Sequence, residues 1–168
     1  MAAPVPSATK IIDACSLSAA RDALAREGKR LVMTNGCFDL LHLGHVRYLE
    51  AARSGGDALA VALNSDSSVR RLKGEGRPVN SQDDRAAILA AMACVDFVTI
   101  FEDERVTRLI EVVRPMAYAK GGDYQLESLN PDERAALAKC GAEIFFVPMI
   151  PGRSTTRIVD LLRGYGCA

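Results

Sequence analysis

The sequence contains no tryptophan, and aromatic side chains make up only 5% of its 168 residues. Because surfaces that stack single-stranded nucleic acid need several aromatic rings, a surface of this type is not expected. An excess of one charge is also missing, since 21 basic side chains are balanced by 21 acidic ones. Nonspecific affinity for phosphate backbones or anionic lipids needs a basic surplus. We therefore expect neither nucleic acid nor a membrane surface as a partner.

Long hydrophobic runs and paired cysteines are absent as well. No apolar stretch approaches the roughly 20 residues that a membrane helix needs. The first residues lack the basic head and apolar core of a secretory signal. The five cysteines are widely spaced, without a C-x-x-C pair, so neither a disulfide framework nor a structural zinc site is predicted. These features favour a cytoplasmic protein with reduced thiols.

What the chain does contain is typical of one globular domain. Hydrophobic residues make up 49% of the sequence and charged residues 25%, which supplies enough apolar surface for a sizeable core. Residues 1–10 include several prolines and alanines, and we expect a flexible leader there. A single domain is expected over 11–168, because no linker or internal repeat divides that range.

Apolar runs and amphipathic stretches alternate along this domain. Strands are predicted over 31–34, 57–63, 96–101, 116–120 and 143–149, and helices over 16–26, 43–54, 81–94, 106–113, 131–140 and 154–163. The polar, glycine-containing segment 64–80 is predicted as a loop. Five apolar strands separated by helices indicate an α/β fold, with a five-stranded parallel sheet and helices on both of its faces. Ligands of such sheets bind beyond the carboxyl ends of the strands.

The only two histidines of the chain come just after the first predicted strand. His42 and His45 flank Gly44 at the amino end of a predicted helix, where free N–H groups and the helix dipole attract anions. Three interpretations are open. A zinc site lacks the further ligands of a usual set, and a purely structural histidine pair is the second reading. Phosphate binding by imidazole donors is the third, and it suits the stabilisation of charge on a transferring phosphoryl group.

A second candidate anion site lies at the start of the last predicted helix. The hydroxyl residues Ser154, Thr155 and Thr156 follow Gly152 and Arg153. A guanidinium and the free N–H groups of a helix start are suitable donors to phosphate. The alternative is that Ser154 is only a helix cap, although three consecutive hydroxyl residues exceed what a cap needs.

Two other loops have both a plain and a functional interpretation. Lys73 and Arg77 follow the second strand, either as solvated cations or as charges gathered near a phosphate. Their loop is not a Walker loop, because the lysine precedes the glycines. Gly121 and Gly122 follow the fourth strand, either as a plain turn or to let a planar base approach the backbone. No Ser-His-Asp set, Cys-His pair or G-x-G-x-x-G loop appears, which disfavours hydrolases and dehydrogenases.

Together these motifs resemble those of the H-x-G-H nucleotidylyltransferases. Within that superfamily the chain is most similar to the adenylyltransferase domain of the bacterial ADP-heptose pathway, which acts on D-glycero-β-D-manno-heptose 1-phosphate. The resemblance runs from about Lys29 to Leu162, nearly the whole chain. The segments that carry it are Thr34–Asp39, His42–His45, Asn64–Asp66, Arg71–Gly74, Arg77–Asn80, Val95–Asp96, Lys120–Tyr124 and Ser154–Thr156.

The resemblance implies a Rossmann-like nucleotide-binding fold and transfer of AMP from ATP to a sugar 1-phosphate, with Mg²⁺ and release of pyrophosphate. It implies catalytic roles for His42, His45 and Lys73, and no metal ligands in the chain itself. The nucleotide-binding residues that it implies are Thr34, Asn35, Gly36, Phe38, His42, His45, Gly121, Gly122, Asp123, Ser154, Thr155 and Thr156. The residues expected to contact the second substrate are Asp39, Asn64, Asp66, Lys73, Arg77 and Arg85.

The resemblance also has departures and alternatives. Many relatives fuse this domain to a sugar kinase, so a separate sugar kinase is expected in the pathway, and a homodimer is left open. Tyr118 stands where relatives carry an aliphatic residue, and Arg153 precedes the Ser-Thr-Thr run. The second hypothesis is CTP-dependent transfer to an alcohol phosphate such as glycerol 3-phosphate, because cytidylyltransferases share both motifs. A nucleotide-binding module without catalysis would be favoured by loss of a histidine or of Ser-Thr-Thr, and neither is lost.

Overall fold

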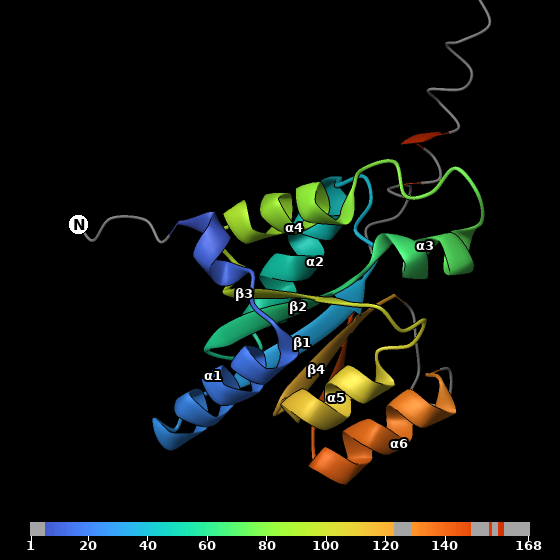
Figure 1. Ribbon diagram of the computed structural model, residues 1–168. Coiled ribbons are helices and arrows are strands. Elements are labelled where there is room, and N and C mark those ends of the chain that lie inside the picture. The colour runs from blue at the N-terminus through green and yellow to red at the C-terminus, as the bar shows by residue number, and fades with distance from the viewer. Residues whose placement is uncertain (1–5, 123–128, 149–154, 156–157, 160–168) are drawn as a thin grey trace, which may run out of the picture.

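A parallel sheet of five strands forms the centre of the protein (Figure 1). The computed structural model describes residues 6–122, 129–148, 155 and 158–159. Across the sheet the strands lie in the order β3-β2-β1-β4-β5. Their bounds are β1 Leu31–Gly36, β2 Ala58–Asn64, β3 Phe97–Phe101, β4 Ala117–Gly121 and β5 Glu143–Val147.

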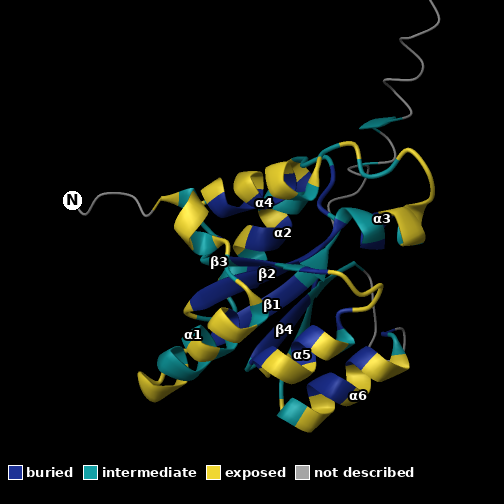
Figure 2. Cartoon of the chain, viewed as in Figure 1, coloured by how far each residue is buried: buried dark blue, intermediate teal, exposed yellow. Residues whose placement is uncertain are grey.

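Helices cover both faces of this sheet, which confirms the predicted fold class. The helices are α1 Ala14–Arg26, α2 Leu43–Arg53, α3 Asp66–Lys73, α4 Gln82–Ala91, α5 Thr107–Val113 and α6 Pro131–Cys140. Helices α2 and α4 pack on one face, and α1, α5 and α6 pack on the other. Figure 2 shows the consequence: the central strand β2 is wholly buried, while each helix turns an exposed side outward.

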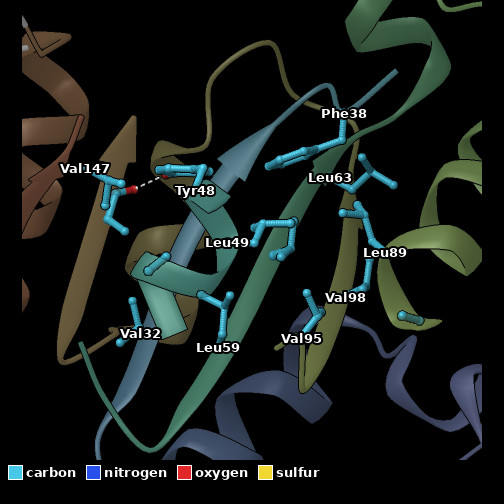
Figure 3. Close-up of a cluster of buried hydrophobic side chains, with 14 of the residues drawn as sticks. Val32, Phe38, Tyr48, Leu49, Leu59, Leu63, Leu89, Val95, Val98 and Val147 are labelled. Atoms are coloured by element: carbon cyan, nitrogen blue, oxygen red, sulfur yellow. Dashed lines mark hydrogen bonds between the residues drawn. The ribbon is translucent and has the colours of Figure 1, made fainter. Parts of the chain in front are cut away.

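The alternation of side chains along β2 shows how the two layers are filled. Leu59, Val61 and Leu63 pack under α2 and α4, whereas the alanines at 58, 60 and 62 face α1 and α5. Successive strand residues point to opposite faces, so every second residue enters the same layer. Figure 3 shows the first layer, in which Leu49 of α2 and Leu89 of α4 meet the branched residues of the strands. Burial on both faces explains why the strands read as unbroken apolar runs.

The strand order reverses beside β1. The first three strands add outward from β1 to β3, and the chain then crosses back to place β4 on the other side of β1. In open parallel sheets the crevice at such a reversal, beyond the carboxyl ends of the strands, is where ligands bind. The two strands that meet there end at Gly36 and Gly121.

The segment 64–80, predicted as a loop, contains helix α3, so that prediction is wrong. Ser65 caps this helix through its hydroxyl, which accepts a hydrogen bond from Ser68 N. The helix offers only a narrow apolar side, since its buried residues are Ser68 and Val69. A helix of this composition has no hydrophobic stripe for the sequence pattern to detect. Lys73 is therefore the last residue of a helix, not part of a flexible loop.

Residues 7–10, which the sequence predicted as part of a flexible leader, are folded against the domain. A 3₁₀-helix spans Ser7–Lys10, and Ile11 pairs with Val98 at the edge of the sheet. Lys10 is anchored as well, because its ammonium donates to Val95 O at 2.7 Å. In the described part of the chain, none of the helices has the length and apolar character needed to cross a membrane.

Candidate active site

His42 forms the amino-terminal cap of helix α2. Its side chain accepts a hydrogen bond from the backbone N–H of Gly44, with 3.1 Å between His42 Nδ1 and Gly44 N. A ring nitrogen that accepts carries no proton, so the neutral imidazole carries its proton on Nε2. The cap therefore fixes the tautomer, in which Nε2–H is the donor. This is the form that phosphate binding requires.

His45 stacks on His42 one turn further along the same helix. The ring centroids lie 3.9 Å apart with 25° between the planes. Burial lowers the pKa of His45 to about 4, and the neighbouring His42 contributes a smaller part of the shift. His45 is therefore neutral at physiological pH. Its buried Nδ1 has no hydrogen-bond partner among the described residues.

Phe38 supports the histidine pair from the other side. Its ring lies 5.3 Å from the His45 ring, tilted by 58°. The backbone of Phe38 has a φ of 42°, a conformation that non-glycine residues rarely adopt and that is found mostly at functional sites. Gly36 makes this arrangement fit, because a Cβ there would lie 2.8 Å from the Phe38 ring. The two residues were predicted to line the nucleotide site, and the structure gives them a common packing role.

A cavity of about 180 Å³ opens at the reversal of strand order. It is lined by Asn35, Gly36, Cys37, Phe38, His45, Tyr48, Lys120 and Gly121. Of the predicted nucleotide-binding residues, these include Asn35, Gly36, Phe38, His45 and Gly121. The cavity therefore joins the histidine loop to the end of β4, two segments far apart in the sequence.

Thr34 is placed differently from the other predicted residues. It is fully buried, and its hydroxyl shares a hydrogen bond with the hydroxyl of Tyr48. Tyr48 in turn donates to Ala119 O at 3.0 Å, the contact drawn as a dashed line in Figure 3. Thr34 thus connects β1, α2 and β4 beneath the cavity. Its expected contact with the nucleotide stays a prediction.

The Asp39 carboxylate holds two loops together. It is almost fully buried, and it accepts from Arg77 Nε at 2.6 Å. Its other oxygen accepts from the backbone N–H groups of Val79 at 2.8 Å and Asn80 at 3.1 Å. Asp39 was predicted to contact the second substrate, whereas these bonds use both of its oxygens. Arg77 is left partly exposed, with 21% of its side chain accessible.

Arg85, which is expected to contact the second substrate, is a buried connector in the structure, and its expected contact stays a prediction. Its side chain has no exposed area, and its Nη2 pairs with Asp66 Oδ1 at 2.8 Å. The same guanidinium donates to Cys37 O at 2.6 Å, Asn64 O at 2.9 Å and Asn80 O at 3.1 Å. It therefore ties the ends of β1 and β2 to α3 and α4. The side chain of Asn64 is also engaged, donating to Ser68 Oγ at 2.9 Å.

Lys73 lies exposed at the end of α3. Its positive charge reaches the Cys37 thiol, whose pKa is raised chiefly by burial and is lowered again in part by Lys73. Because Cys37 lines the cavity, this electrostatic effect places the Lys73 charge within range of the candidate site. Gly74, with a φ of 87°, ends the helix directly after it.

Part of the second anion site lies outside the described residues. This applies to Ser154 and Thr156, and to most of the helix predicted over 154–163. Asp123, predicted to bind the nucleotide beyond β4, also lies outside the described residues. Thr155 is described and helical, and its hydroxyl donates to Leu40 O at 3.3 Å. Gly122 is also described, with a φ of 121° that favours glycine. The contact with Leu40 places Thr155 against the histidine loop.

Three residues of the cavity were not predicted as site residues: Cys37, Tyr48 and Lys120. Lys120 could have been found, because a polar side chain at the carboxyl end of a strand is in the right place for a ligand. Tyr48 gave no signal, since an aromatic residue on the inner side of a helix normally belongs to the core. Among the described residues no group of three or more His, Cys, Asp or Glu side chains could hold a metal ion.

Comparison with known proteins identifies the family of the chain. Residues 33–160 match the family described as cytidylyltransferase-like. Among curated relatives, the bifunctional protein HldE of Geobacter sulfurreducens is 50% identical over 141 residues, which is 83% of this chain and 28% of that protein. HldE of Geobacter metallireducens is 47% identical over 161 residues, or 95% of this chain and 32% of that protein. The chain thus spans about a third of the length of these relatives.

Solved structures give the same result. A lipopolysaccharide core biosynthesis protein from Thermoplasma volcanium is 27% identical, with a TM-score of 0.59, and the match covers 73% of this chain and 98% of that one. A pantothenate synthetase from Thermus thermophilus is 18% identical with a TM-score of 0.54, covering 84% of this chain and 62% of that one. At that identity the second likeness concerns the fold alone.

Proposed function

Since the chain belongs to the cytidylyltransferase-like family and is thereby a nucleotidylyltransferase, we propose that it transfers AMP from ATP to a sugar 1-phosphate. The proposed products are an ADP-sugar and pyrophosphate, and the proposed acceptor is D-glycero-β-D-manno-heptose 1-phosphate. The observation that carries the proposal is the stacked His42–His45 pair at the start of α2, beside a cavity at the strand-order reversal. Identity of about 50% to HldE proteins supports the choice of the heptose phosphate.

The residues present suit direct in-line attack. The phosphate of the acceptor is already a nucleophile, so the reaction needs neither a covalent intermediate nor a strong base. The protein must place that oxygen in line with the α-phosphorus of ATP and stabilise the charge that develops on the departing pyrophosphate. His42 is suited to donate from Nε2, because its Nδ1 is occupied by the cap on Gly44. His45 is suited to act beside it as a neutral ring.

Cations and the last helix complete the proposed site. Lys73, exposed and next to Gly74, is positioned to approach the phosphates when they are bound. Ser154, Thr155 and Thr156 are proposed to hold the outer phosphates of ATP, and the contact of Thr155 with Leu40 supports this placement. Gly121, Gly122 and Asp123 are proposed to lie beside the base and ribose.

Magnesium is proposed to enter with the nucleotide. The described residues contain no acidic group that could hold the ion alone, so the phosphates of ATP would be its main ligands, as is usual for Mg²⁺. When bound, the ion would neutralise negative charge on the phosphates. The steps assigned to the chain itself do not depend on a resident metal.

CTP-dependent transfer to an alcohol phosphate is the second candidate function. The observation that favours it is the family match, which carries the description cytidylyltransferase-like. The motif Lys120–Tyr124 favours the first candidate, because it resembles the adenylyltransferases of the ADP-heptose pathway. Both candidates use the same histidine pair and differ in the base and the acceptor.

Pathway partners are proposed from the relatives. The HldE proteins are named bifunctional, and the chain matches about a third of them. We infer that a sugar kinase supplies the sugar 1-phosphate in the same pathway, that the reaction takes place in the cytoplasm, and that a homodimer is one form of the protein to be tested.

Pyrophosphate release tests the proposal. Purified protein would be assayed with ATP, CTP, GTP and UTP, each against a small panel of sugar 1-phosphates and glycerol 3-phosphate. The expected result is the fastest release with ATP and the heptose 1-phosphate. Faster release with CTP and glycerol 3-phosphate would establish the second candidate, and no release with any pair would contradict both.

A further inference from the structure

A polar cluster that the proposed mechanism does not use lies where β1 and β4 end. Tyr118 and Lys120 are two residues apart in β4, so their side chains lie on the same face of the sheet. Asn35 lies near the end of the neighbouring strand β1. Its amide oxygen Oδ1 accepts from the Tyr118 hydroxyl at 2.6 Å and from Lys120 Nζ at 3.2 Å.

The donors in this cluster fix the orientation of the Asn35 amide. A lysine ammonium only donates, so the amide atom that faces Lys120 must be the oxygen. Because an amide oxygen only accepts, the Tyr118 hydroxyl must donate its proton to it. The amide nitrogen Nδ2 is consequently turned away from both partners, and it donates to no described residue. Asn35 and Lys120 both line the cavity, so Nδ2 is the amide atom left to meet a ligand.

The cluster is held from behind by two buried groups. Glu133 of α6 has only 5% of its side chain exposed and accepts from Lys120 at 3.5 Å. Tyr118 is fully buried, and burial raises its pKa well above its ordinary value, with the charge of Glu133 adding to the effect. The Tyr118 hydroxyl therefore keeps its proton throughout the physiological range. The arrangement is rigid before any ligand arrives, which favours precise binding.

We propose that Tyr118 is a positioning residue, which orients the Asn35 amide so that Nδ2 donates to a phosphate oxygen of the bound nucleotide. A phosphate is the expected acceptor because the Lys120 ammonium stands next to the donor, and a cation beside a donor selects an anionic group that only accepts. The inference rests on the proposed function.

Removal of the single hydroxyl tests the proposal. Tyr118→Phe keeps the ring and deletes the hydrogen bond to Asn35. Thr99→Val is the matched control, because Thr99 is equally buried and its hydroxyl donates to Ile12 O at 2.9 Å, away from the cavity. Binding of ATP and of adenosine would be measured by calorimetry, adenosine by competition. The same titrations would be made with Asn35→Ala and with the Asn35→Ala/Tyr118→Phe double variant, and melting would be followed for all of them.

The expected result separates positioning from packing. Tyr118→Phe should weaken ATP binding about fivefold, the loss expected for one hydrogen bond, and leave adenosine binding unchanged. In the Asn35→Ala background the same substitution should have no further effect on ATP. Thr99→Val should lower the melting temperature about as much as Tyr118→Phe does, without changing ATP affinity.

Three outcomes would overturn the proposal. These are unchanged ATP affinity in Tyr118→Phe, an equal loss with adenosine, or a loss that persists in the Asn35→Ala background. A wild-type chain that does not bind ATP in these titrations would instead overturn the proposed function, and the inference with it. A wild-type chain that binds ATP and an unaffected Tyr118→Phe variant would overturn the inference alone.

Discussion

His42 and His45 stack face to face, with their ring centroids 3.9 Å apart. Two imidazolium rings at this distance would repel each other, and burial disfavours the charged form of His45 further. A fixed double charge on the pair is therefore unfavourable, which is consistent with the proposed role in hydrogen-bond donation. Phe38 and the cap on Gly44 hold the rings in this relationship, so the geometry exists before substrate binds.

Replacement of either histidine should remove turnover while the protein stays folded. We expect His45→Ala to lower kcat by about 10²–10³, the usual cost of losing one preorganised donor to developing charge. His42→Ala should lose activity to a similar extent, and should also lose about 1 kcal/mol of stability, because His42 caps α2. Pyrophosphate release and chemical denaturation would measure the two effects.

His42→Asn is the matched control for the cap. Asparagine supplies an oxygen that can accept from Gly44 N, so stability should return toward that of the wild type. Activity should stay low, because the imidazole Nε2–H is still missing. Full activity in any of these variants would contradict the phosphate-binding role of the pair.

The low pKa of His45 predicts how stability depends on pH. The ring binds a proton near pH 6.5 in the unfolded chain and only near pH 4 in the native one, so unfolding takes up a proton between these values. The contribution of His45 to stability is therefore complete above about pH 6.5 and is lost as the pH falls toward 4. As the pH is lowered across this window, the melting temperature of the wild type should fall more steeply than that of His45→Gln.

Proton NMR gives an independent measure of the same property. The ring resonances of His45 should show no titration between pH 6 and 8. A His45 titration midpoint near neutrality would contradict the neutral state assigned to this ring at physiological pH. It would also remove the reason for the difference in melting.

Lys73→Ala should change kinetics without changing stability. Lys73 is exposed at the end of α3, so stability should change by no more than about 0.5 kcal/mol. We expect kcat at saturating substrate to fall by at least about tenfold, because the charge is needed most as pyrophosphate departs. Arg70→Ala, an exposed cation on the same helix, is the control and should keep wild-type kinetics. A raised KM with unchanged kcat would show that Lys73 only attracts substrate.

Arg85→Met should be among the most destabilising single substitutions in the chain. It leaves Asp66 without its partner and three backbone oxygens without a donor, at a cost on the order of 3 kcal/mol. Arg47→Met is the control, since Arg47 and Glu50 form an exposed pair and removal of such a pair costs less than about 1 kcal/mol. Urea denaturation would compare them, and equal losses would contradict the connector role of Arg85.

Most of the fold could be predicted because hydrophobic periodicity and buried strands are strong signals. The five strands were found in this way. The helix that follows Asn130 was found from its capping residue, and in the structure Asn130 accepts from the N–H groups of two residues of the first turn. Helix α3 was missed because its polar residues carry no apolar stripe, although Ser65 is a typical cap. The order of the strands was not predictable, since it depends on which crossovers pack and not on local pattern.

Part of the candidate site was indicated by chemistry and motif together. His42 and His45 were singled out by their spacing and their place after a strand, and Gly36 by the family resemblance; the structure places His45 and Gly36 at one cavity. The role of Arg85 could not be predicted, because a sequence does not show that a guanidinium is buried between four loop ends. The orientation of Asn35 also depends on partners more than 80 residues away, with a separation of 83 to Tyr118 and 85 to Lys120.

The carboxylate of Asp39 has a consequence for how chains of this kind can vary in length. Because it binds the backbone of Val79 and Asn80 directly, an inserted or deleted residue between Arg77 and Asn80 would pull the pairing out of register. Glu75 and Gly76 are exposed and make no hydrogen bond with any described residue, so extra residues there would leave the anchor intact. Natural insertions and deletions in this connection should therefore gather on the α3 side of Arg77 and be absent from the segment Arg77–Asn80.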